Sequence, residues 1–174
     1  MNDLRYPIGP FVVEKAPDAT WRQARIAEIE ELPARLREAV RDLSPEQLET
    51  PYRPEGWTVR QVVSHVPDSH MNAYLRFRWA LTEEQPTIKL YKEALWAELA
   101  DSRTALPEVS LSLLEALHAR WAILLRSLSP EDWKRTLMHP DHGVIDLDRL
   151  LGLYAWHGRH HTAHVTALRE RMGW

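Results

Sequence analysis

The 174-residue chain contains no cysteine. This absence excludes disulfide bonds, a thiolate nucleophile and thiolate metal ligands. The chain also lacks any apolar run approaching 18 residues, and its first residues lack the basic, apolar and small-residue order of a secretory signal. We therefore expect a cytoplasmic protein that does not associate with membranes.

Charge of one sign is not concentrated anywhere in the sequence. The 22 basic and 25 acidic residues are spread along the chain and give a net charge of −3. Without a basic stripe we expect no nucleic-acid partner, and without a block of like charges we expect no disordered tail. The length suits one domain with a sizeable core. We expect residues 1–174 to form that domain, with 1–17 as an irregular N-terminal arm.

Apolar residues recur at helical spacing in four long segments, at about 18–43, 58–81, 110–128 and 146–171. Ser44 with Pro45, and then Thr58, are typical of helix starts. Pro33 and Pro67 fall inside two of the segments and predict a bend or a break there. A shorter helix is expected at about 91–99. No segment alternates with period two, so the predicted class is all-α, a four-helix bundle with a long connection between its second and third helices.

Histidine is abundant where cysteine is absent. Four of the nine histidines lie in the stretch "WHGRHHTAH": His157, His160, His161 and His164. At 100° per residue they share an arc of roughly 100° with several leucines, which predicts a buried face. Each buried imidazole needs partners for two ring nitrogens. Four of them on one buried face therefore favour a metal site or catalysis over packing alone.

Helical geometry limits how many of these residues one ion can use. His157 with His161 and His160 with His164 are both i,i+4 pairs, the arrangement of H-E-x-x-H zinc helices, although the glutamate of that motif is missing. One face of one helix cannot surround an ion. A third ligand must come from another helix, and at this point either pair can supply the first two.

The second long segment offers a candidate for the third ligand. His65 lies on a polar stripe with Asp68, Asn72 and Arg76, whereas His70 points about 140° away and is a poorer candidate. A three-histidine site with open positions is the arrangement of catalytic zinc, but nitrogen ligands also suit nickel, iron or copper, so the ligands do not select the metal. We therefore expect one divalent ion per subunit, which lowers the pKa of a bound water or of a substrate thiol.

Several stretches resemble the YfiT branch of the DinB-like superfamily. They are "YRPEGWTVRQVVSHVPDSHMNAYLRFRWALTEE", "LHARW", "HPD" and "LGLYAWHGRHHTAHVTALRERMGW". The resemblance implies a metal-dependent hydrolase with a four-helix bundle, a homodimer, and nickel or zinc on three histidines. Carried over by position, those ligands are His65, His160 and His164. His157, His161 and Asp68 then become candidates for acid–base groups or for neighbours of the ligands.

Three functional hypotheses follow. In the first, a hydrolase activates a metal-bound water against a small-molecule substrate that Asn72 and Arg76 help to bind. In the second, a thiol S-transferase presents the thiolate of a low-molecular-weight thiol, of the bacillithiol or mycothiol type, to an electrophile. The missing glutamate base favours this alternative, and related DinB-like proteins are assigned as such transferases. In the third, the protein binds a metal without catalysis.

Overall fold

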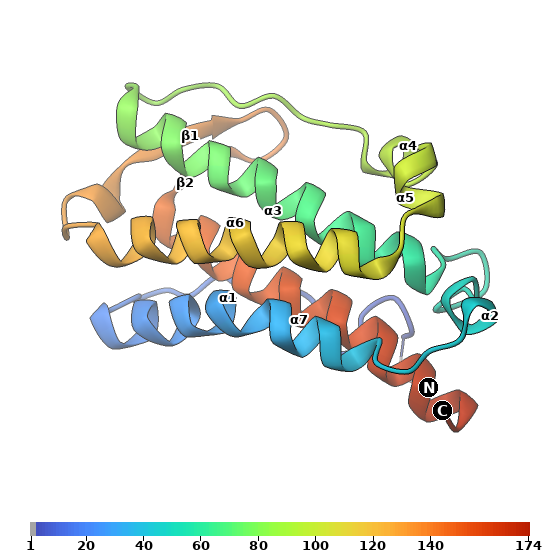
Figure 1. Ribbon diagram of the computed structural model, residues 1–174. Coiled ribbons are helices and arrows are strands. Elements are labelled where there is room, and N and C mark those ends of the chain that lie inside the picture. Colours follow the sequence, from blue (N-terminus) through green and yellow to red (C-terminus); the bar gives the residue numbers. More distant parts are fainter. Residues whose placement is uncertain (1–2) are drawn as a thin grey trace.

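The computed structural model describes residues 3–174 and contains four long helices. They are α1 (Ala19–Ala39), α3 (Val59–Thr82), α6 (Pro107–Ser127) and α7 (Leu147–Met172). Helices α1 and α3 each pack against both α6 and α7, so the four form a bundle (Figure 1). The predicted all-α four-helix bundle is confirmed, together with the long connection between α3 and α6.

Shorter elements occupy the connections between the long helices. They are α2 (Pro45–Leu48), α4 (Glu93–Trp96), α5 (Ala100–Thr104), the 3-10 turn η1 (Asp132–Lys134), and the strands β1 (Thr136–His139) and β2 (Gly143–Asp146). The two strands pair as an antiparallel hairpin, in which Thr136 faces Asp146 and His139 faces Gly143. The hairpin was not predicted from the sequence, in which no segment alternates with period two. Strands of four residues are too short to display a clear period-two pattern.

The predicted helix starts are confirmed, but neither internal proline breaks its helix. Ser44 and Thr58 each close a capping box with a glutamine three residues later. Helix α1 continues through Pro33, and α3 continues through Pro67. A proline removes only one amide donor from a helix, and both of these prolines are buried in the bundle, where packing holds the chain on either side.

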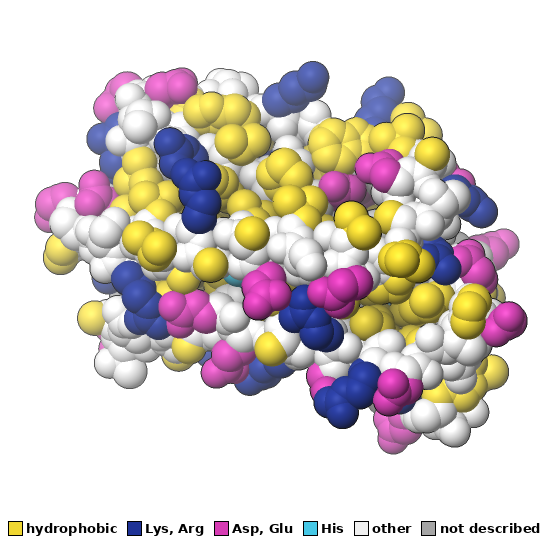
Figure 2. All heavy atoms as spheres, in the orientation of Figure 1, with side chains coloured by type: hydrophobic (Ala, Val, Ile, Leu, Met, Phe, Trp, Pro, Cys, Tyr) yellow, Lys and Arg dark blue, Asp and Glu magenta, His cyan; other side chains and the backbone are white. Residues whose placement is uncertain are grey.

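The arm predicted at 1–17 contains no helix or strand in residues 3–17, and residues 1 and 2 lie outside the described part of the chain. Among the described residues, no helix has the length and apolar character needed to cross a membrane. Acidic and basic side chains are scattered between apolar ones on the face shown in Figure 2, where histidine atoms are almost completely hidden.

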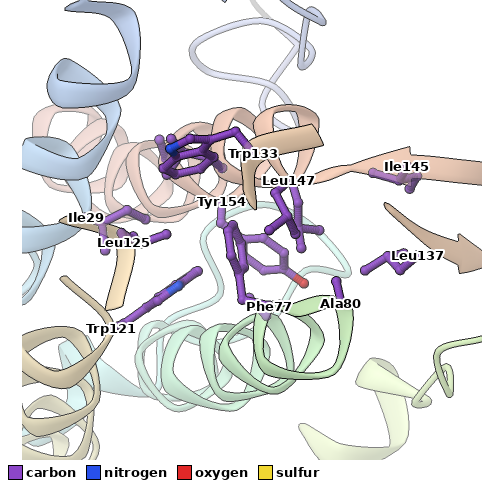
Figure 3. Close-up of a cluster of buried hydrophobic side chains, with 14 of the residues drawn as sticks. Ile29, Phe77, Ala80, Trp121, Leu125, Trp133, Leu137, Ile145, Leu147 and Tyr154 are labelled. Carbon is purple, nitrogen blue, oxygen red and sulfur yellow. The ribbon is translucent and has the colours of Figure 1, made fainter. Parts of the chain in front are cut away.

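Two groups of apolar side chains fill the bundle. The hairpin-side cluster contains Phe77, Trp121, Trp133, Leu147 and Tyr154, with Leu137 and Ile145 of the hairpin (Figure 3). The second group, which we call the capping-loop cluster, contains Leu36, Val62, Val63, Leu114 and Leu168, with Leu48 and Tyr52 from the segment between α1 and α3.

Histidines lie between the two clusters along three of the long helices. On α6, His118 stands between Leu114 of one cluster and Trp121 of the other. On α3 and α7 the same interval holds His70, His157 and His161, whereas His65 lies between Val63 and Val66 of the capping-loop cluster. We call these five residues the histidine layer: His65, His70, His118, His157 and His161. The bundle therefore contains a polar layer between two apolar ones.

Candidate metal centre

Three imidazoles from two helices meet inside the bundle. His65 of α3 and His157 and His161 of α7 bring one ring nitrogen each within 4.8 Å of the others, and within residues 3–174 this is the only group of three such side chains. The Nε2 atoms of His65 and His157 are 3.3 Å apart. Two zinc–nitrogen bonds of about 2.0–2.1 Å at a tetrahedral angle separate their nitrogens by about 3.3–3.4 Å. The spacing therefore fits two ligands of one ion.

These imidazoles are held in the neutral form that binds metals. Burial lowers the pKa of His65 to about 4, with repulsion from His164 as a further cause. Burial also lowers the pKa values of His157 and His161 well below the usual value for histidine, and the neighbouring imidazoles add to the effect. The Nδ1 atom of His161 is buried and finds no hydrogen-bond partner among the described residues. Neutral, incompletely paired nitrogens have lone pairs available for an ion.

His160 and His164, the two ligands expected on α7, do not join this group. His160 stacks on Trp156 with ring centroids 4.4 Å apart. His164 stacks on Tyr52 at 4.0 Å, and its Nε2 lies 3.1 Å from the carbonyl oxygen of Arg5. The geometry therefore favours the other i,i+4 pair of the same helix. The reason is the rotation of α7 about its axis, which turns His157 and His161 toward α3 and turns His160 and His164 toward the arm.

A cleft of about 510 Å³ opens onto the group. Two of the three clustered imidazoles, His65 and His161, line it together with His160 and His164. Its other walls come from the arm, from the loop that precedes α3 and from the start of α4, through Arg5, Tyr6, Tyr52, Arg53, Glu55, Gly56, Trp57 and Glu93. A small molecule entering this cleft would thus meet the imidazoles directly.

The loop before α3 is shaped to hold aromatic and cationic side chains at the cleft. The amide of Tyr52 donates to the carbonyl of Trp57 over 3.0 Å, and the Trp57 ring lies 4.6 Å from the His65 ring. A Cβ atom on Gly56 would lie 2.7 Å from Cγ of Arg53, so only glycine permits this close turn without displacing Arg53. No role at the site was predicted for these residues from the sequence, although the stretch "YRPEGW" supplies the tyrosine, arginine and tryptophan.

The other predicted site residues, Asp68, Asn72 and Arg76, are not among the residues lining the cleft. Asp68 is half-buried, and burial together with Asp101 raises its pKa to about 6. The Asn72 amide donates to the backbone of Asp68, while the buried Arg76 donates to the Tyr154 hydroxyl over 2.9 Å. Their roles in acid–base chemistry and substrate binding stay predictions.

A glycine determines how closely the histidine-bearing part of α7 approaches α1. Gly158 directly follows His157, and a Cβ atom there would overlap the side chain of Leu32. The absence of a side chain lets the two helices pack at this level. His70, the poorer candidate for a ligand beside His65, is not in the group of three, and its Nε2 lies 3.2 Å from Nδ1 of His157.

Comparison with known proteins shows close relatives over the whole chain. The model of the DinB superfamily matches residues 28–165. A Bacillus cereus (strain AH820) protein named "Putative metal-dependent hydrolase" is 58% identical over the full length of both chains. The structure of YfiT from Bacillus subtilis, described as a probable metal-dependent hydrolase with an unusual four-helix bundle topology, has a TM-score of 0.96 at 50% identity and covers 98% of each chain.

A more distant structural likeness concerns the fold alone. The mycothiol-dependent maleylpyruvate isomerase has a TM-score of 0.67 at 18% identity, over 83% of this chain and 60% of the isomerase.

Proposed function

Since this chain belongs to the DinB superfamily, we propose that it is a metal-dependent hydrolase whose ion is held by His65, His157 and His161. The observation that carries the proposal is the meeting of three neutral imidazoles, buried at His65 and His161 and half-buried at His157, beside a cleft of small-molecule size. The nitrogens of His65 and His157 are 3.3 Å apart, as two ligands of one ion would be. Nitrogen ligands suit zinc and nickel, and we propose one of these two ions.

When bound, the ion would supply Lewis acidity, which polarises a carbonyl and lowers the pKa of a water. The chain's own residues would orient the substrate. Tyr6, Tyr52 and Trp57 offer aromatic surfaces beside the histidines, while Arg53 offers a cation. We therefore propose a substrate with a planar or apolar part and an acidic group. His160 lines the same cleft as a neutral imidazole, because burial lowers its pKa to about 4. It can accept a proton, but only as a weak base.

Thiol transfer is a second candidate, favoured by one observation. Within residues 3–174, no carboxylate forms a hydrogen bond or an ion pair with the three clustered imidazoles. Hydrolysis benefits from a strong protein base, and glutamate supplies it in H-E-x-x-H zinc enzymes. A thiol ionises near pH 8–9 without help and more readily beside a cation, so transfer of a low-molecular-weight thiol makes a smaller demand on the protein.

Metal content tests the ligand set. Protein purified without a histidine tag would be loaded with zinc or nickel, dialysed, and its metal content per subunit measured. We expect His157→Ala to lose the ion and the matched variant His164→Ala, from the other i,i+4 pair, to retain it. Loss of the ion in His160→Ala and His164→Ala with retention in His157→Ala would overturn the assignment.

Activity assays of the same preparations separate the functions. Metal-dependent hydrolysis of esters or amides that is lost in His157→Ala would support the hydrolase. Conjugation of monochlorobimane to cellular thiols without any hydrolysis would replace the hydrolase with the transferase. A metal-loaded protein inactive in both assays would favour metal binding without catalysis.

A further inference from the structure

A row of hydrogen-bonded imidazoles crosses the bundle and ends at the candidate metal centre. Nδ1 of His118 lies 2.5 Å from the backbone carbonyl oxygen of Ile29. Nε2 of His118 lies 2.9 Å from Nδ1 of His70, and Nε2 of His70 lies 3.2 Å from Nδ1 of His157. The carbonyl belongs to α1 and the imidazoles to α6, α3 and α7, so all four long helices contribute.

The first member of the row determines its direction. A carbonyl oxygen can only accept, so Nδ1 of His118 must carry a proton. A neutral imidazole has one N–H group, so Nε2 of His118 accepts and Nδ1 of His70 donates to it. By the same rule, Nε2 of His70 accepts from Nδ1 of His157. The remaining nitrogen of His157, Nε2, then has no proton, and this is the atom 3.3 Å from Nε2 of His65.

The rule requires that His118 and His70 are neutral. His70 has no exposed surface, and His118 is 1% exposed. Burial lowers the pKa of His118 to about 4, and within residues 3–174 no charged side chain forms a hydrogen bond or an ion pair with either ring. A proton added to His70 would turn its Nε2 into a donor and reverse the last hydrogen bond. Burial therefore keeps the direction of the row constant at neutral pH.

We propose that His118 and His70 are positioning residues that fix the tautomer of His157, so that its Nε2 presents a lone pair to the metal centre. The inference rests on the proposed metal-binding function and extends it to two residues that touch neither ion nor cleft. Metal-bound histidines usually donate their second N–H to a carboxylate, a carbonyl or water. Here the acceptor is the imidazole of His70. The backbone carbonyl of Ile29 on α1 fixes the tautomer of His118, and His118 fixes that of His70, so the row needs no negative charge in the core.

The direct test measures tautomers in the metal-free protein. With ¹⁵N-labelled histidine, long-range ¹H–¹⁵N correlation spectra distinguish protonation at Nδ1 from protonation at Nε2, and His→Gln variants assign the signals. We expect His118, His70 and His157 to be protonated at Nδ1. A proton on Nε2 of His157 would overturn the proposal. Because no metal is needed, this result is independent of whether the proposed function is correct.

A pair of substitutions tests the consequence for metal binding. His118→Gln keeps both hydrogen bonds of this side chain, since its amide can donate to the Ile29 carbonyl and its oxygen can accept from His70. His118→Leu removes both hydrogen bonds. Loss of an outer hydrogen-bond partner costs a ligand roughly 10–100-fold in metal affinity. We expect that loss in His118→Leu, measured by competition with a chelating dye, and affinity within about threefold of the parent in His118→Gln, since it keeps the partner.

Leu114→Ala is the control, because Leu114 lies one turn before His118 on the same helix, is fully buried, and belongs to the capping-loop cluster rather than to the row. It should destabilise the fold and leave metal affinity unchanged. Unchanged affinity in His118→Leu, or an equal loss in Leu114→Ala, would contradict a positioning role.

Discussion

The hairpin-side cluster and the histidine layer lie on the same helices but become buried in different ways. In the cluster, the ring of Phe77 packs edge to face against Trp121 and Trp133, and each tryptophan brings a single polar atom, its indole N–H, which on Trp121 has no hydrogen-bond partner among the described residues. In the layer, each imidazole has two ring nitrogens to satisfy, and an unpaired buried polar group costs about 1–3 kcal/mol. We therefore expect the apolar clusters to determine the stability of the fold and the layer between them to determine metal binding.

The largest expected effect on stability comes from the cluster. Phe77 is fully buried, with its ring 5.5 Å from the Trp121 ring. Phe77→Ala should lower the free energy of unfolding by about 3–5 kcal/mol, since it removes apolar contacts and leaves a cavity. Urea denaturation measures this loss. The folded variant should still bind the ion with the affinity of the parent protein. A folded variant that loses the ion would contradict the expectation that the cluster and the layer have separate roles.

Acidification should destabilise the layer while leaving the apolar contacts intact. The pKa values of His65 and His118 are about 4 in the folded protein against 6.5 for free histidine. Folding disfavours the protonated forms of both imidazoles. The stability that depends on their neutral forms is therefore fully present above pH 6.5, and it is lost as the pH falls from 6.5 toward 4. Across that pH range, protonation of each residue should lower the free energy of unfolding by roughly 3 kcal/mol.

Thermal melts of metal-free protein between pH 7 and pH 4.5 would measure this pH dependence. Asp68 acts in the opposite direction, because its raised pKa of about 6 contributes stability below pH 3.8 that is lost as the pH rises toward 6. His118→Gln removes one titrating group and should make the slope shallower. Equal stability across the range would show that the layer is not held neutral.

A smaller effect on the free energy of unfolding is expected where the layer packs against α1. Gly158→Ala places a methyl group against Leu32 in a filled interior, which should cost about 1–3 kcal/mol. Leu32→Ala in the same chain should relieve the overlap, so that the double variant is more stable than the sum of the two single losses predicts. Strict additivity in a denaturation cycle would argue against this contact.

The smallest effect on the free energy of unfolding is expected at the start of α7, far from the histidines along the helix. The Asp146 side chain caps the helix by accepting from the amide of Arg149 over 2.7 Å. Asp146→Ala should lower the free energy of unfolding by about 1 kcal/mol, as loss of an N-cap usually does. Metal affinity, measured alongside a thermal melt, should not change, and a coupled loss would mean that the two regions are not independent.

The sequence was sufficient to predict the helices, but not their rotation. Periodicity and capping motifs located the four long helices, and they placed all four histidines of "WHGRHHTAH" on one buried face. The two i,i+4 pairs on that face differ by a rotation of only about 60° around the helix axis. That rotation depends on contacts such as Gly158 against Leu32, which no pattern within one helix reveals. The predicted pair and the pair that the geometry favours therefore differ.

The partners of His157 were hidden for a related reason. Helical spacing predicts that His70 points about 140° away from His65, yet both rings contact His157, and these contacts depend on the distance between α3 and α7. His118 is a single histidine in the stretch "LHARW", where nothing in the sequence distinguishes it from a residue that only fills the core. Connections of this kind become visible only when all four helices are assembled.

The contact between the N-terminal arm and His164 has a consequence for the choice of ligands. The carbonyl of Arg5 can only accept, so Nε2 of His164 carries the proton and the lone pair of this imidazole lies on Nδ1, which is buried and finds no hydrogen-bond partner among the described residues. The arm thus leaves Nδ1 of His164 for a ligand, whereas the row of imidazoles leaves Nε2 of His157. Two histidine pairs with the same spacing on one helix therefore differ in the nitrogen that their outer partners leave free, and at His164 a segment without helix or strand selects that nitrogen.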